Sequence, residues 1–327
     1  MYCSKCGNKI REGMRFCSKC GKRVSPAEEH SNDANSKAES VEATATDNTS
    51  RNRIAIIIAI VSLVAVITLL IFFGIKNGDN NATKEIQNAQ IGDYIVFGSY
   101  EQNNNISDGP EDIEWRVIDK NDDQLLIISK YILDGKPYNT EEVDVTWETC
   151  TLRDWLNNDF YSTAFDETEK NMIIVTTNHN PDAREFDNHW DGKGGNDTYD
   201  KVFLLNCSEV DDYLNNRQCM LTDYASESIL DAVILHYYKE EYGEDWIEEK
   251  EKETGKDLRS YVIDDWQYYG AGGDSYFWWL RSPGYDQKSG TDITVQGDQI
   301  CSLGIKNYHI GVRPVMWISN YSMGKQE

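Results

Sequence analysis

An uncharged apolar run of 22 residues, IAIIIAIVSLVAVITLLIFFGI, occupies positions 54–75 of the chain. A helix needs about 20 apolar residues to cross the hydrocarbon core of a bilayer, so this run is long enough to span one. A buried core helix of this length normally carries a polar face, and this run has none. The sequence therefore predicts one transmembrane helix at 54–75, with the lipid bilayer as a partner.

The charges on either side of the run predict its orientation. Arg51 and Arg53 precede it, whereas Lys76 and Asp79 follow it, so the positive-inside rule places the N-terminus in the cytosol. The expected localisation is the cell membrane, crossed once, with the N-terminus cytosolic and the C-terminal domain extracytoplasmic.

Four cysteines form two CxxC pairs, Cys3-x-x-Cys6 and Cys17-x-x-Cys20, at the N-terminus. Each pair makes a tight turn that directs two sulfurs to one point, and four thiolates in a tetrahedron suit Zn²⁺. A segment this small cannot bury a core, so zinc would be its main source of folding free energy. A redox CxxC normally opens a helix of a βαβ fold, which this segment lacks, and disulfides would require the opposite topology. We predict a structural zinc held by these four residues.

The CxxC spacing, with Phe16 before the second pair, resembles the short zinc ribbon at the N-terminus of many bacterial proteins. That resemblance implies a structural zinc, because four protein ligands leave no open coordination position. A polar stretch without aromatic residues follows and is typical of a flexible tether. The predicted organisation is a ribbon at 1–24, a linker at 25–53, the transmembrane helix at 54–75, a polar tether at 76–90 and an extracytoplasmic domain at 91–320. The partner of the ribbon stays open.

The net charge of −24 is concentrated in the C-terminal part of the chain. Residues 77–327 hold 49 Asp and Glu against 21 Lys and Arg, so this part repels phosphate backbones and is not expected to bind nucleic acid. All nine Trp also lie there. This number of indoles indicates a packed globular domain rather than a disordered acidic tail.

Apolar and alternating segments predict the secondary structure of that domain. Strands are expected at 93–98, 113–119, 124–129, 202–206, 276–281 and 310–318, with a hairpin in ITVQGDQICSL. Helices are expected in TLRDWLNNDFY, in SEVDDYL with Ser208 at a capping-box position, and over 228–239. The mixture predicts an α+β domain with mostly antiparallel pairing.

The segments GDYIVFGSYEQ, IEWRVID, VTWETCTLRDWLN, FWWLRSPG and GVRPVMWI resemble, in that order, a family of bacterial domains of unknown function. The resemblance covers about residues 91–319. Its closing WWLRSPG…GVRP pattern is similar to the C-type-lectin-like fold of formylglycine-generating enzymes and implies that fold. Residues 226–273 depart from the family pattern and are predicted to form an acidic helical insertion, whose role stays open.

Trp279 and Arg281 share one face of the predicted strand at 276–281 and are the candidate ligand-binding residues. An exposed Trp beside an Arg can stack on a sugar or a peptide. The alternative, which residue preferences favour, is a core Trp with Arg281 paired to a buried carboxylate. The loop at 178–200 is rich in Asp, Asn and Gly but lacks the register of a calcium loop, so a solvated loop is favoured.

Catalysis finds little support in the sequence. The motifs G-x-S-x-G and H-E-x-x-H do not occur, and the remaining cysteines show no motif spacing: Cys150, Cys207, Cys219 and Cys301. The sequence favours a domain that binds a cell-wall glycan or a protein at the cell envelope. Two alternatives stay open, namely a formylglycine-generating type of oxidase or another enzyme on the same fold, and a sensor that passes a signal to the zinc ribbon.

Overall fold

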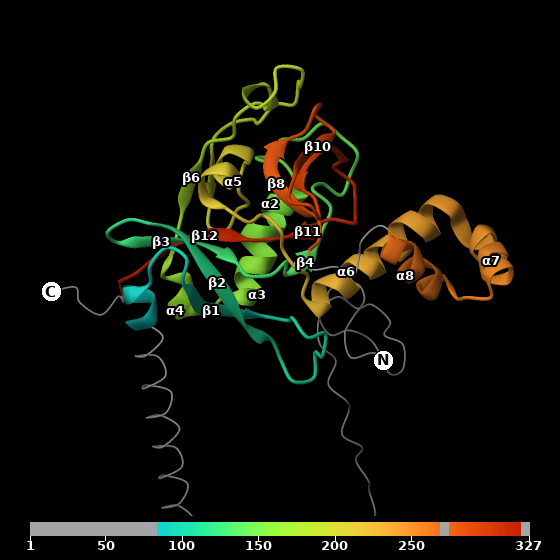
Figure 1. Cartoon of the computed structure of the whole chain (residues 1–327), viewed down its shortest axis with the longest axis horizontal. Helices are drawn as coiled ribbons and strands as arrows, with labels where there is room; N and C mark the ends of the chain where they lie inside the picture. The colour runs from blue at the N-terminus through green and yellow to red at the C-terminus, as the bar shows by residue number, and fades with distance from the viewer. Residues whose placement is uncertain (1–83, 269–274, 322–327) are drawn as a thin grey trace, which may run out of the picture. The chain divides into compact units, whose positions relative to one another are not determined.

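A computed structural model of the chain describes residues 84–268 and 275–321, and Figure 1 shows the elements that they form. The predicted zinc ribbon, the linker and the apolar run at 54–75 lie outside these residues. The described part is a β-rich domain with two five-stranded sheets, a small two-stranded sheet and a group of helices.

The first sheet is antiparallel throughout, in the order β1-β2-β3-β12-β5. Its strands are β1 (Tyr94–Tyr100), β2 (Glu111–Lys120), β3 (Gln124–Ser129), β12 (Val315–Ser319) and β5 (Ile173–Ile174). Leu125 to Ile128 of β3 are all buried, so both faces of this central strand are covered, which explains its continuous apolar run. Val315 lies opposite Ile128, so the last strand of the domain pairs with its central strand.

The second sheet has the order β10-β9-β8-β11-β4. Its strands are β10 (Gln299–Gly304), β9 (Ser289–Ile293), β8 (Trp278–Pro283), β11 (Gly311–Val312) and β4 (Asp134–Gly135). Only the β8–β11 pair of this sheet is parallel. The predicted hairpin is confirmed as β9 and β10, with Gly297 at a φ of 88° in its turn, a conformation that favours glycine.

The helices complete the described part. The helical run predicted in TLRDWLNNDFY is confirmed as α2 (Thr151–Trp155), η1 (Leu156–Phe160) and α3 (Tyr161–Ala164). The other helices include α4 (Glu167–Lys170), η2 (Ala183–Glu185), α5 (Cys207–Tyr213), α6 (Asp223–Val233), η3 (Ile234–Tyr242), α7 (Gly243–Thr254) and α8 (Leu258–Tyr268), and residues 84–88 are also helical. A two-stranded sheet joins β6 (Thr176–Asn178) to β7 (Thr198–Asp200). Figure 1 shows α6, α7 and α8 grouped together in the region that was predicted to be a helical insertion.

Two local predictions are wrong around residue 206. The segment 202–206 forms no strand, and its sheet contact is an isolated bridge between Phe203 and Val315. The cap of α5 is Asn206 rather than Ser208, because Asn206 and Glu209 form a reciprocal capping box. The Glu209 amide donates to Asn206 Oδ1 over 2.8 Å, and the Asn206 amide donates to Glu209 Oε2 over 2.9 Å.

The predicted membrane placement is corrected. Among residues 84–268 and 275–321, no helix is long and apolar enough to cross a membrane. The helices of the described insertion carry charged side chains, including Asp231 of α6, Glu240 of η3 and Glu249 of α7. The predicted fold class with a transmembrane helix and the predicted single-pass localisation therefore find no support in the described residues, and the run at 54–75 on which they rested lies outside them.

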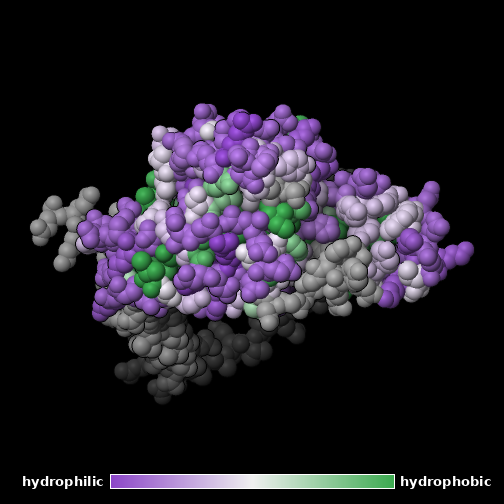
Figure 2. Space-filling model, turned by 45° about the horizontal axis from the view of Figure 1, so that its top comes forward, coloured by the Kyte–Doolittle hydropathy of each residue, from purple (hydrophilic) through white to green (hydrophobic). Residues whose placement is uncertain are grey.

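The core is organised around buried indoles. Four Trp are at most 1 % exposed, and each indole N–H is satisfied by a buried or backbone acceptor, as this side chain requires in an interior. The pairs are Trp115 with the Phe97 carbonyl at 2.6 Å, Trp147 with Asp200 at 3.0 Å, Trp278 with the Arg217 carbonyl at 3.0 Å and Trp279 with the Lys136 carbonyl at 2.9 Å. Outside the core, Figure 2 shows a mainly hydrophilic face with hydrophobic residues in small separate patches.

Asp292 of β9, unlike these indoles, is a buried polar side chain without a hydrogen-bond partner among the described residues. Its side chain is 1 % exposed, and neither carboxylate oxygen has a hydrogen-bond partner among the described residues. Burial raises the pKa of Asp292 to about 7. Between pH 4 and 7 the folded domain therefore holds a proton that the unfolded chain has released, so stability present below pH 4 is lost as the pH rises to 7.

We predict that the Asp292→Asn variant removes this pH dependence. A rise in pKa from 3.8 to about 7 corresponds to about 4 kcal/mol, so the variant should gain on the wild type by up to that amount between pH 4 and pH 8. Urea unfolding at several pH values measures the difference. Asp298→Asn, in the exposed turn of the same hairpin, is the charge-matched control. A difference that stays constant with pH would contradict the prediction.

Candidate functional site

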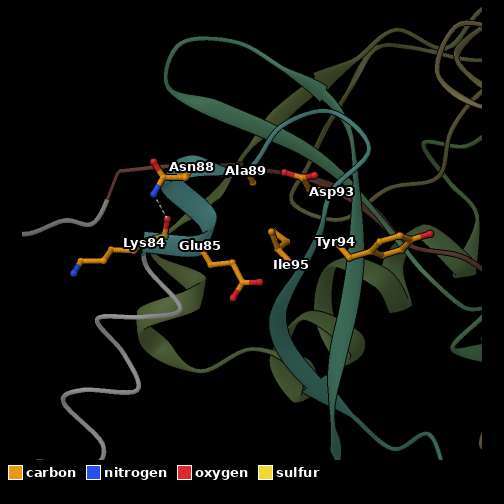
Figure 3. Close-up of a pocket in the computed structure, with 7 residues that line it drawn as sticks. All are labelled: Lys84, Glu85, Asn88, Ala89, Asp93, Tyr94 and Ile95. Carbon is orange, nitrogen blue, oxygen red and sulfur yellow. Dashed lines mark hydrogen bonds between the residues drawn. The ribbon is translucent and has the colours of Figure 1, made fainter.

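A hollow of about 490 Å³ lies beside β1, at the start of the described residues (Figure 3). Figure 3 shows the side chains of Lys84 and Tyr94 pointing away from each other, and the hydrogen bond drawn there joins Asn88 Nδ2 to the Lys84 carbonyl over 2.7 Å. The polar side chains that line this hollow do not converge on a common point. We therefore do not take this hollow as the candidate site.

A second concave region, made of two adjoining hollows, is larger in total volume. Two hollows of about 460 and 410 Å³ share three lining residues, His236, Lys306 and Tyr308, and so form one continuous depression, named here the η3 groove. Its walls come from four parts of the chain: the end of α6 together with η3, the turn at 304–309, the loop at 135–142 and Lys288 just before β9. A concave site lined by rings and a few polar groups is the usual form of a ligand-binding site.

Two pairs of rings line the groove. The His236 imidazole stacks on the Tyr308 ring with centroids 4.2 Å apart and planes 13° apart. The next residue of the helix, Tyr237, meets His309 edge to face at 6.0 Å. The π-helical register of η3 also brings the hydroxyl groups of Tyr237 and Tyr242 to 3.2 Å, a separation of five residues. Successive residues of η3 thus contact successive residues of the turn.

Two carboxylates, Glu240 and Glu141, act electrostatically on Tyr308. Glu240 Oε1 lies 3.2 Å from His236 Nδ1, one helical turn away. Burial, together with the negative charges of Glu240 and Glu141, raises the pKa of Tyr308. The hydroxyl therefore stays protonated at neutral pH and is available as a hydrogen-bond donor inside the groove.

The buried carboxylate of Asp134 binds two residues that line the groove. It accepts hydrogen bonds from the Tyr100 hydroxyl at 2.7 Å, the Ser228 hydroxyl at 2.6 Å and the Gly135 amide at 2.7 Å. The ammonium of Lys136 lies 2.9 Å away. Ser228 and Lys136 both line the groove, so this network holds that part of the lining in position.

The sequence-predicted residues Trp279 and Arg281 lie in the core instead of at a surface. Arg281 is 2 % exposed, donates from Nη2 to Glu209 Oε1 over 2.6 Å and from Nη1 to the Leu204 carbonyl over 2.7 Å. Trp279 is fully buried. These contacts match the alternative considered from the sequence, a core Trp with Arg281 paired to a carboxylate, here that of Glu209. Neither Trp279 nor Arg281 is accessible to a ligand.

The Asp-rich loop between β6 and β7 uses its carboxylates within the loop. Three such pairs are Asp197 with His179 at 2.8 Å, Asp187 with His189 at 2.9 Å and Asp182 with Lys193 at 2.8 Å. The hydrogen bond from Lys193 lowers the pKa of Asp182. No group of three or more His, Cys, Asp or Glu side chains that could hold a metal occurs in the part of the chain that the structure describes.

Three cysteines of the domain, Cys150, Cys207 and Cys219, are buried thiols. Burial raises the pKa of Cys150 to about 12 and also raises the pKa of Cys219. A buried neutral thiol is a poor nucleophile, so these residues give the oxidase alternative no support. The predicted zinc ligands Cys3, Cys6, Cys17 and Cys20 lie outside the described residues.

Sequence reasoning missed the η3 groove. Its residues come from separate parts of the chain and form no spaced motif, and only folding brings them together. The available signal was the pair of short aromatic runs, His236-Tyr237-Tyr238 in the predicted helix and Tyr308-His309 before the last strands. Neither run indicates a partner by itself.

Comparison with known families agrees with both sequence resemblances. Residues 122–320, more than half of the chain, match the family described as domain of unknown function DUF6273, and residues 2–24 match a zinc-ribbon domain. The chain therefore belongs to the DUF6273 family and begins with a zinc-ribbon domain. No curated protein and no solved structure matches it, and the resemblance to the C-type-lectin-like fold is unconfirmed.

Proposed function

We propose that the chain is a two-module binding protein. The zinc ribbon is held together by a structural metal, and the DUF6273 domain binds a ligand in the η3 groove. The proposed ligand binding rests on one observation, namely that four rings and several polar side chains line one depression. The rings are those of His236, Tyr237, Tyr308 and His309. The proposed ligand is a glycan or a peptide.

The composition of the groove supports that ligand class. Aromatic rings pack on the flat faces of sugars and on peptide groups, while hydroxyl, ammonium and carboxylate groups fix orientation. The face seen in Figure 2 is mainly hydrophilic, with hydrophobic residues in small separate patches. The mixture of rings and polar groups in the groove therefore suits a polar ligand.

The ring contacts give the first test of this proposal. The Tyr308→Ala variant removes the ring that stacks on His236, and it should weaken ligand binding at least about tenfold, as removal of an aromatic anchor does. The full chain is screened on glycan and peptide arrays, and hits are measured by calorimetry. Tyr199→Ala is the control, since Tyr199 lies outside the groove and is 70 % exposed. Hits that bind Tyr308→Ala as tightly as wild type, or an absence of hits, would contradict the groove.

The zinc proposal assigns one Zn²⁺ to Cys3, Cys6, Cys17 and Cys20. Its support is the match of residues 2–24 to a zinc-ribbon domain and the spacing of the two CxxC pairs, which suits a tetrahedral thiolate site. When bound, the metal would supply folding free energy to this segment, and with four protein ligands it would hold no open position for catalysis.

Elemental analysis of the purified full chain tests this assignment. We expect one zinc per chain in the wild type and a loss of most of it in Cys17→Ser, because three thiolates bind far less tightly than four. Cys219→Ser, which alters a buried thiol of the other module, should keep the full zinc content. A zinc-free wild type, or full zinc in Cys17→Ser, would count against the assignment.

A further inference from the structure

Two lysines of the η3 groove have no counter-ion in the part of the chain that the structure describes. Lys288 and Lys306 both line the hollow of about 410 Å³ and are exposed, and neither ammonium has an ion pair or hydrogen bond among the described residues. Lys136, in the same groove, differs because it is paired with Asp134 at 2.9 Å. The first two lysines therefore present free positive charge to whatever occupies the groove.

Two exposed carboxylates line the same hollow as these lysines. Glu142 and Glu241 line it and are exposed, and no ion pair joins either of them to a cation in the described part of the chain. Elsewhere on this domain, opposite charges that share a surface do pair, as Lys130 does with Glu114 at 2.6 Å. Charges of both signs thus face one depression while staying apart from each other.

We propose that the ligand of the η3 groove is zwitterionic. Its carboxylate would pair with Lys288 and Lys306, and its ammonium with Glu142 and Glu241, while its body packs on the rings of the groove. This inference rests on the proposed binding function and adds the charge pattern of the ligand. A short peptide with free termini and an amino sugar that carries a carboxylate share this chemistry.

Electrostatics favours a zwitterion over a ligand of one charge. The chain carries a net charge of −24, so an anionic ligand approaches against the field of the whole molecule. A cationic ligand would cover Lys288 and Lys306 without pairing them, and an unpaired charge removed from water is costly. A ligand with both charges and no net charge avoids both penalties.

The size of the groove agrees with a small ligand. Its two hollows, of about 460 and 410 Å³, are within the range of about 300–1,000 Å³ that small-molecule sites occupy. A dipeptide or one substituted sugar ring fits such a volume.

Calorimetry of the full chain with capped and uncapped probes tests the inference. The probes are dialanine with free termini, its N-acetyl form, its C-terminal amide and muramic acid, an amino sugar with a carboxylate. Free dialanine or muramic acid should bind, and capping either end of the peptide should weaken binding at least about tenfold, the usual effect of losing a charge-assisted hydrogen bond. Binding of the peptide alone or of the amino sugar alone identifies the source of the ligand.

Variants that remove one charge show which protein residue binds the carboxylate of the probe and which binds its ammonium. Lys306→Gln should weaken the free peptide and leave the amide unchanged, whereas Glu241→Gln should weaken the free peptide and leave the N-acetyl form unchanged. Lys252→Gln is the control, because Lys252 of α7 is exposed and outside the groove.

Three results would overturn the inference: capped probes that bind as tightly as free ones, a Lys306→Gln variant that behaves as wild type, or no binding of any probe. None of these touches the proposed function, which fails only if the arrays yield no ligand that depends on Tyr308.

Discussion

The carboxylate of Asp134 is 1 % exposed and lies where three parts of the domain meet. It accepts hydrogen bonds from Tyr100 of the first sheet and from Ser228 of α6, and it belongs itself to β4 of the second sheet. A buried carboxylate that lacks partners costs several kcal/mol, so folding has to bring these groups together. Burial, and next the charge of Asp134, raise the pKa of Tyr100, which keeps its hydroxyl a donor in this network.

The position of α6 follows from this network and from one glycine. A Cβ built on Gly135 would lie 2.0 Å from Ile229 Cγ1, so only glycine lets α6 approach β4 this closely. The helix then continues into η3 without a cap, since Ile234 keeps α-helical angles. His236 and Tyr237 are therefore held against Tyr308 and His309 by contacts made two turns earlier. The groove is thus a consequence of how the helices are anchored to the sheets.

The sequence predicted the strands well where apolar residues run continuously. Residues 124–129 and the hairpin after residue 288 needed only local signals, namely a buried run and a Gly-Asp turn. The segment 202–206 was misread because an equally apolar run is buried as extended chain beside Val315 instead of as a paired strand. Trp279 and Arg281 were assigned to one face by alternation, yet β8 is buried on both faces, and a single sequence does not reveal what covers a strand.

The candidate site could not be predicted because its chemistry is distributed. Lys306 and Tyr308 come from a turn, His236 from a π-helix and Glu141 from a loop, and no spacing rule joins them. Their proximity depends on tertiary contacts such as the bond between Asp134 and Ser228, which join residues 94 positions apart. The zinc ribbon is the opposite case, because its ligands lie within 18 consecutive residues and are read directly from the spacing.

Hydrogen exchange of the full chain, compared between wild type and Asp134→Asn, tests most directly whether Asp134 anchors the helices that form the groove. The amides of α6 and η3 should exchange at least about tenfold faster in the variant, while β3 and β12 keep their protection, because the lost partners hold one helix and not the central strands. Ser228→Ala, which removes a single hydrogen bond, should show the same pattern more weakly. Unchanged exchange in α6 and η3, or equal acceleration in β3 and β12, would contradict this account.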